Sequence, residues 1–219
     1  MPERPRRQRT TRRWVVRRRV VRWLEIATHV GALAPLAALA WMFWQDRLGP
    51  VPVETVIRLL GRYALTLLLL TLVPTVVRTV TGFGEIVRLR RPLGLYAFLY
   101  AALHFLAFAG LDFGFRVGLI VTTILQSRRE IVGLVALAIL GLLALTSIRS
   151  LMRKLGTTWK TVHRLIYAAG GLVVLHYVWN YKESRTWPAV AGTALLVLVL
   201  ARVPAVRDFL SQRPGSRSS

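Results

Sequence analysis

The chain has 219 residues, 54% of them hydrophobic, and its mean hydropathy of +0.49 exceeds what a soluble domain of this size requires. It contains no cysteine, which excludes disulfides, thiolate catalysis, iron–sulfur clusters and Cys-attached heme. The formal net charge of +22 comes mainly from arginines at the start of the chain and between apolar segments, a placement that indicates membrane flanks rather than a nucleic-acid-binding face.

The first 22 residues form an arginine-rich arm, with ten arginines between Arg4 and Arg22. This basic part is too long for a convincing signal peptide, and the apolar segment that follows is long enough to span a membrane and remain there. Since a basic arm beside a membrane can bind anionic lipid headgroups, we expect a cytoplasmic arm that contacts lipid. The apolar residues of 12–24 are spread around the helical wheel and predict no clean interfacial helix.

Six apolar segments follow the arm, each of roughly 17–23 residues, which is the length that a bilayer core of ~30 Å requires. The loops between them are short, and no internal repeat is evident. The sequence therefore predicts an all-α integral membrane bundle of about six transmembrane helices, forming one domain over residues 23–205 and followed by a polar tail, 206–219. The predicted spans are 24–44, 56–78, 93–111, 130–148, 161–181 and 187–204.

The charges of the loops predict the orientation of the bundle. The arm, the loop before residue 93 and the loop 149–160 are basic, whereas the loops after the first and third spans have nearly balanced charge. Because basic loops remain in the cytoplasm, both termini of this multi-pass protein are expected there. The first, third and fifth helices then run from the cytoplasm outward.

Four histidines, His29, His104, His163 and His176, all fall in predicted spans or at their edges. Ionisable residues inside a membrane are costly and point to function, and neutral imidazole is a common axial ligand of heme iron. His104 lies about eleven residues into its helix and His176 about fifteen into another helix of the same direction. We therefore expect both in the outer half of the bilayer, where they could clamp one heme.

His163 and His29 lie nearer the cytoplasmic face and could form a second, weaker site. His163 and His176 cannot bind one iron, because thirteen residues correspond to about 20 Å along a helix. Each histidine could instead be a hydrogen-bond partner between helices, an alternative that is strongest for His29.

Basic residues after the fourth span could hold an anionic group such as a heme propionate or a flavin phosphate. The positive-inside rule explains these residues equally well. No phosphate-binding loop, dinucleotide glycine fingerprint or hydrolase triad is present. The basic residues are Arg149, Arg153, Lys154, Lys160 and Arg164.

Several motifs together resemble the ferric-reductase-like membrane proteins of the MsrQ (YedZ) family. Their order and spacing over residues 22 to 204 make the resemblance specific, whereas any one motif alone is weak. The motifs are Gly61-Arg62-Tyr63-Ala64-Leu65, Arg90-Arg91-Pro92-Leu93-Gly94-Leu95-Tyr96, Tyr100–His104, Leu145-Thr146-Ser147, Arg153–Gly156, Trp159, His163–Tyr167 and His176–Trp179, with His29 before them.

The resemblance implies a heme b-binding electron-transfer subunit of an oxidoreductase in the inner membrane. Such a subunit takes electrons from quinol and passes them to a periplasmic molybdopterin reductase that repairs methionine sulfoxide. The matching positions for heme ligation are His104, His163 and His176. The resemblance also implies FMN, for which the chain has no recognisable motif, and the long basic arm departs from the family's usual short start.

Two other classes stay open on the sequence. A di-heme ferric reductase or transmembrane NADPH oxidase relative usually carries two histidines on the third helix and needs a cytoplasmic flavin and nucleotide module, neither of which is found here. A small transporter would have polar residues along a path and inverted repeats, and neither is evident.

Overall fold

The computed structural model describes residues 6–180, 186–203 and 206, with side chains from Arg19 onward. Every regular element in this part of the chain is helical, which confirms the all-α class. The fifth-loop charges Lys182, Glu183 and Arg185, the first five residues of the arm and nearly all of the tail lie outside the described residues. The elements are α1 (Arg6–Trp44), α2 (Pro52–Thr81), the 3₁₀ helix η1 (Gly84–Leu89), α3 (Arg90–Ala107), the π-helical turn η2 (Phe108–Asp112), α4 (Val117–Gln126), α5 (Arg128–Leu145), α6 (Arg149–Leu155), α7 (Thr158–Val162), α8 (Leu165–Asn180) and α9 (Thr186–Leu200).

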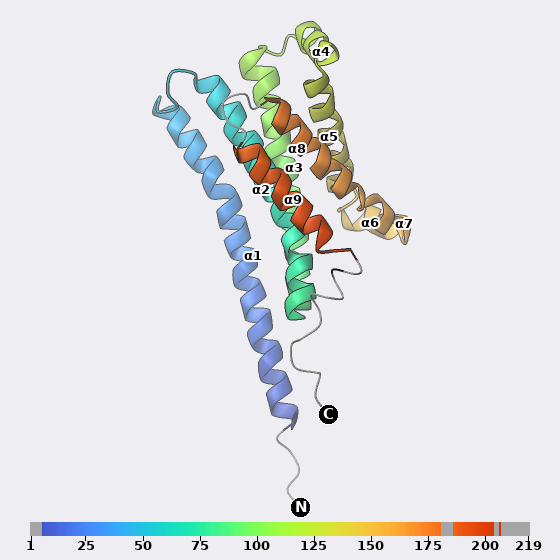
Figure 1. The fold of residues 1–219 in the computed structure, drawn as a ribbon. Helices are drawn as coiled ribbons and strands as arrows, with labels where there is room; N and C mark the ends of the chain where they lie inside the picture. Colours follow the sequence, from blue (N-terminus) through green and yellow to red (C-terminus); the bar gives the residue numbers. More distant parts are fainter. Residues whose placement is uncertain (1–5, 181–185, 204–205, 207–219) are drawn as a thin grey trace, which may run out of the picture.

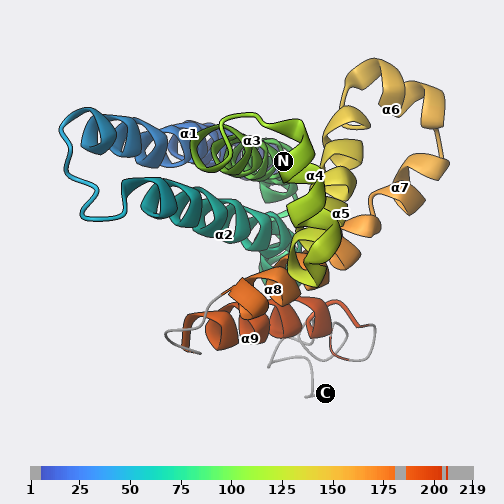
Figure 2. The same ribbon diagram turned by 90° about the horizontal axis from the view of Figure 1, so that it is seen from above.

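The helices pack as a bundle around the antiparallel pair α2 and α3. Helix α1 packs along α3 on one side, α5 and α8 form a second pair on the other, and α9 lies beside α8 (Figures 1 and 2). The core is apolar at the α2–α3 contact, where Leu68 and Tyr100 are almost fully buried and the small Ala97 lets the helices approach closely. The pair α2–α3 is therefore the scaffold on which the other helices are placed.

Three segments of the described chain are long and apolar enough to cross a bilayer alone: Arg19–Trp44, Pro52–Thr81 and Gly84–Asp112. Helices α5 and α6 would make a fourth span if this pair, bent by 92°, crossed together. The described parts of α8 and α9 have 16 and 15 residues and reach about 24 and 22 Å, less than a bilayer core of ~30 Å. The all-α membrane bundle is confirmed. Within the described residues, three or four segments satisfy the length and composition of a span.

Helix α1 joins the arm and the first span into one helix of 39 residues, about 58 Å long. Its first half projects beyond the rest of the bundle (Figure 1). Trp23 and Trp44 are 65% and 84% exposed, and their separation of 21 positions corresponds to roughly 31 Å, the thickness of the hydrocarbon core. Since tryptophan prefers membrane interfaces, we take these two residues as the boundaries of the span.

Helix α4 was not predicted, because residues 112–129 were interpreted as a loop from their charges. The ten residues of α4 are too few to span a bilayer but carry a strong helical pattern, with Ile120 buried and Val117, Val121 and Leu125 exposed. The helix lies at the end of the bundle where α3 ends and α5 begins (Figure 1).

The predicted span 161–181 is also corrected. Helices α6 and α7 occupy the preceding loop, and the chain turns at His163 and Arg164 before α8 begins at Leu165. Gly156 separates α6 from α7 with a φ of 52°, a conformation that glycine adopts without a steric penalty. His163 therefore lies in a turn and not in the first turn of a continuous helix.

Candidate functional site

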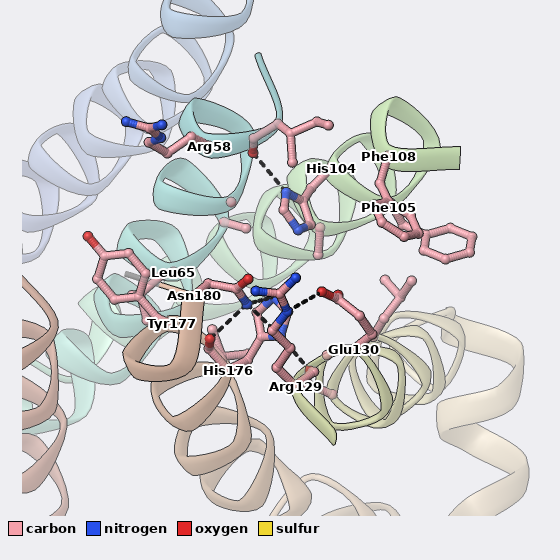
Figure 3. A pocket seen from close by; sticks show the side chains of 18 of the residues that line it. Arg58, Leu65, His104, Phe105, Phe108, Arg129, Glu130, His176, Tyr177 and Asn180 are labelled. Carbon is pink, nitrogen blue, oxygen red and sulfur yellow. Dashed lines mark hydrogen bonds and ion pairs between the residues drawn. The ribbon is translucent and has the colours of Figure 1, made fainter. Parts of the chain in front are cut away.

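A cavity of about 770 Å³ lies among α2, α3, α5 and α8 (Figure 3). This volume is within the roughly 300–1,000 Å³ of typical ligand and cofactor pockets. The walls are mostly apolar, with Leu65, Leu68, Leu137 and Leu140 among them, and two of the polar groups that face it are histidines. A cavity whose walls are mainly apolar and which two imidazoles face is the expected form of a site for a flat, mainly hydrophobic cofactor.

His104 of α3 and His176 of α8 approach each other across this cavity, with ring centroids 6.2 Å apart and ring planes at 85°. An imidazole nitrogen binds a transition metal at roughly 2 Å and lies about 1.1 Å from its ring centre, so two imidazoles on opposite sides of one metal have centroids about 6.3 Å apart. The observed separation thus matches two axial ligands of one metal ion.

Both imidazoles are held by their Nδ1 atoms, 2.8 Å from a backbone carbonyl: that of Ile57 for His104 and that of Arg129 for His176. Because a carbonyl oxygen only accepts, each Nδ1 must carry the proton and donate it. Each Nε2 then keeps the lone pair that a metal requires. The protein thereby fixes the tautomer of both rings before any ligand binds.

His104 and His176 are held in the same way, each by a backbone carbonyl and a nearby glycine, which we call the histidine mounts. This similarity was not evident from the sequence, in which no repeat was found. The donor and acceptor residues are 47 positions apart in both cases. One helical turn after each acceptor carbonyl lies a glycine, Gly61 on α2 and Gly133 on α5. A Cβ on Gly61 would lie 3.1 Å from Nδ1 of His104, and a Cβ on Gly133 would lie 2.7 Å from Cε1 of His176. Each imidazole thus occupies space that only glycine leaves open.

The cavity has a charged rim toward the start of α2 and α5. Arg129 pairs with Glu130 at 2.9 Å and Arg58 with Glu54 at 2.5 Å, and all four residues line the cavity. Asn180, one turn beyond His176, donates to the His176 carbonyl at 2.9 Å, and its amide nitrogen lies 3.3 Å from the Nε2 of that histidine (Figure 3). Polar groups are therefore concentrated at one end of an apolar chamber.

His163 lies apart from this cavity, beside the turn between α7 and α8. Its ring packs on Trp159 with centroids 4.0 Å apart, its Nδ1 is 3.2 Å from the Trp159 carbonyl, and its Nε2 is 3.5 Å from Ser147 Oγ. The structure therefore brings His104 and His176 together and separates His163 from them.

His29 is exposed on α1, with Nδ1 2.9 Å from the hydroxyl of Tyr96. Among the described residues, no hydrogen bond or ring contact joins it to His163, the partner with which a second site was expected.

A second polar cluster, which the sequence analysis did not anticipate, surrounds Arg202. Its guanidinium donates to the Tyr167 hydroxyl at 2.5 Å and to the Leu72 carbonyl at 2.6 Å, while its Nε is buried and has no partner in the described part of the chain. Arg90 is close enough to repel Arg202 electrostatically. By contrast, the basic residues that the sequence suggested as anion ligands are exposed: Arg149, Arg153, Lys154, Lys160 and Arg164.

Residues 60–175, more than half of the chain, match the family model described as ferric reductase like transmembrane component. Three relatives carry the name protein-methionine-sulfoxide reductase heme-binding subunit MsrQ. That of Xanthomonas oryzae is 42% identical over 197 residues, covering 87% of this chain and 89% of the relative. That of Xanthomonas axonopodis is 42% identical over 181 residues (80% and 83%), and that of Bordetella pertussis 39% over 178 residues (80% and 86%). The chain belongs to the MsrQ family.

The region that matches the ferric reductase model contains both glycines of the histidine mounts, His104 and His163, and it ends one residue before His176. In this MsrQ family member, sequence reasoning found the histidines but missed the carbonyls and glycines that orient them. The available signal was a glycine 43 residues before each of the paired histidines, at positions 61 and 133.

Proposed function

We propose that this chain is the heme-binding membrane subunit of a protein-methionine-sulfoxide reductase system, with a heme b between His104 and His176. The observation that carries the proposal is the facing pair of imidazoles, 6.2 Å apart, each with Nδ1 held by a carbonyl. The names of the MsrQ relatives, which call those proteins heme-binding subunits, support it.

The residues of the cavity fit a heme. The apolar walls suit the macrocycle, the two Nε2 lone pairs suit the iron, and Arg58 and Arg129 at the rim suit the propionates. When bound, the heme supplies one-electron chemistry, and this chain's residues provide ligation, orientation and exclusion of water. Since each Nδ1–H donates to a carbonyl, both ligands are made more basic, which favours the ferric state.

The electron route that we propose runs from quinol in the inner membrane, through the heme, to a periplasmic molybdopterin-containing reductase. This places the His104–His176 cavity in the outer half of the bilayer, near the acceptor. His163 is proposed as a ligand of a further heme toward the cytoplasm, and the arm 1–22 as a contact for anionic lipid headgroups.

The test of this function is spectroscopic and kinetic. We expect the purified protein to have the absorption bands of a reducible b-type heme. In liposomes a quinol should reduce that heme, and the partner reductase with methionine sulfoxide should reoxidise it. A protein that purifies folded without heme, or whose reduced heme is not reoxidised by the partner, would contradict the proposal.

We expect both termini in the cytoplasm, as the loop charges indicate. Reporter fusions after Asp46 and Arg116 should give periplasmic activity, and a fusion after Arg153 should give cytoplasmic activity. The reverse pattern at all three sites would place the His104–His176 cavity on the cytoplasmic side and contradict the proposed route.

FMN is proposed as a further cofactor, and the Arg202 cluster is the described feature that fits its phosphate. The positive charges of Arg90 and Arg202 interact electrostatically, and the buried Nε of Arg202 lacks an acceptor among the described residues. Arg202→Ala should weaken flavin binding by about tenfold or more, because a hydrogen bond to a charged group contributes roughly 1.5–3 kcal/mol. Flavin fluorescence after denaturation measures this, with the exposed Arg164→Ala as control. Equal flavin content in both variants would contradict the assignment.

A further inference from the structure

His29 is an imidazole on a lipid-facing surface inside the hydrocarbon layer. It is exposed, and α1 lies at the edge of the bundle (Figures 1 and 2). It is six residues, or about 9 Å, inside the boundary marked by Trp23. A polar ring facing lipid is costly, so its presence there calls for a function.

One nitrogen of this ring has a hydrogen-bond partner, and the other has none among the residues that the structure describes. Nδ1 lies 2.9 Å from the Tyr96 hydroxyl, and the two rings meet edge to face with centroids 5.6 Å apart. No group of the described residues forms a hydrogen bond with Nε2. When Nδ1–H donates to the Tyr96 oxygen, Nε2 presents a lone pair to the membrane, where lipid tails offer no donor. A donor that matches Nε2 must therefore itself dissolve in the bilayer.

Residues on two helices connect this ring with its surroundings, one set suited to protons and the other leading toward the proposed heme. Glu25 lies one turn nearer the start of α1 on the same side of the helix, so it can pass a proton toward the cytoplasmic end. On α3, Tyr96, Tyr100 and His104 follow one another at intervals of one turn, and Tyr96 is about 12 Å along the axis from His104. The exposed ring thus lies between a proton exit and the ligand of the proposed heme.

We propose that His29 and Tyr96 form the site where a membrane-dissolved quinol binds and gives up its protons. This rests on the proposed function, in which quinol is the electron donor. One quinol and two ferric hemes yield one quinone, two ferrous hemes and two protons. At each step a quinol O–H bond breaks, its proton passes to His29 Nε2 and then toward Glu25, and one electron would go to the iron that His104 and His176 would hold. The partner reductase must reoxidise this iron before the second step, so that the two electrons leave the quinol one at a time. Positioned proton acceptors of this kind contribute about 10²–10⁴-fold to a rate.

The test is reduction of the heme by decylubiquinol in liposomes, followed in the heme absorption band. His29→Ala should slow this reduction by about 10²-fold. His29→Gln, which can hydrogen-bond but cannot take a proton, should be slowed similarly with little change in the half-saturating quinol concentration. Tyr96→Phe should be slowed less. Val30→Ala, at the adjacent position, which is 61% exposed, is the control and should match the wild type. Heme content and the dithionite-reduced spectrum should be unchanged in all four.

The experiment distinguishes a wrong assignment of the His29 site from a wrong assignment of quinol as the electron donor. If quinol reduces the wild type and His29→Ala at the same rate, the His29 site is wrong and the donor stands. If dithionite but not quinol reduces the wild type, the donor itself is wrong and the site falls with it. Loss of heme from the His29→Ala, His29→Gln and Tyr96→Phe variants alike would also overturn the site, because it would make His29 part of the heme pocket.

Discussion

His104→Ala and His176→Ala should each remove the same heme component from the absorption spectrum, and the double variant should lose no more than either single one. Both imidazoles face one cavity at the separation that a single metal requires. Removing either therefore leaves the iron with one open position or releases the heme, and little remains for the second substitution to remove. Residues that share one partner are non-additive in this way.

The matched control is His163→Ala, which lies outside the cavity and should leave the His104–His176 component in place while altering any second component. Reduced-minus-oxidised spectra, normalised to inserted protein, measure all four variants. Distinct components lost in the His104→Ala and His176→Ala variants, with losses that add in the double variant, would contradict the shared heme.

Gly133→Ala should be nearly as damaging as loss of the histidine, although it adds only one methyl group. The new Cβ would lie 2.7 Å from Cε1 and 2.8 Å from Nδ1 of His176, so the ring must move and lose its hydrogen bond to the Arg129 carbonyl. A displacement of this size at a ligand is expected to cost about 10–100-fold in metal affinity. Heme titration of the apoprotein measures the loss.

A graded series of alanine variants separates this effect from helix stability. Gly61→Ala should weaken heme binding less, because its Cβ would lie 3.1 Å from Nδ1 of His104. Gly171→Ala on α8 meets no atom within 4 Å and should leave heme binding unchanged, while alanine favours the helix by roughly 0.5–1 kcal/mol. Equal heme affinity in the Gly133→Ala and Gly171→Ala variants would show that the glycine does not position His176.

Hydropathy predicted the all-α membrane bundle because soluble proteins rarely need uncharged apolar segments that are long enough to cross a bilayer. It could not predict α4, whose ten residues are shorter than any span. It also missed the turn at His163, although polar and basic residues over 157–164 come before the uncharged stretch that begins at Leu165. Helix α5 alone does not qualify as a span because it begins with charged residues. Helices α8 and α9, as described, are too short, and their bounds depend on packing that hydropathy does not report.

For the site, the similar depth of His104 and His176 in the bilayer was enough to predict that they lie together. Residues at the same depth on two parallel helices can face each other. The supporting carbonyls of Ile57 and Arg129 were beyond sequence reasoning, because any residue supplies a carbonyl and only packing selects which one. The role of Arg202 could not be predicted either, because in the sequence it is one more basic residue after an apolar segment. Only the structure shows its hydrogen bonds to the Tyr167 hydroxyl and the Leu72 carbonyl.

The most direct measurement of the shared ligation is electron paramagnetic resonance of the ferric protein at low temperature. The imidazole planes of His104 and His176 are 85° apart, and perpendicular axial imidazoles leave the iron dπ orbitals that they interact with nearly equal in energy. We predict a strongly anisotropic low-spin signal with one large g value, lost in both His104→Ala and His176→Ala. A rhombic low-spin signal typical of parallel imidazoles, or an anisotropic signal that survives either substitution, would contradict a single heme held between these two residues.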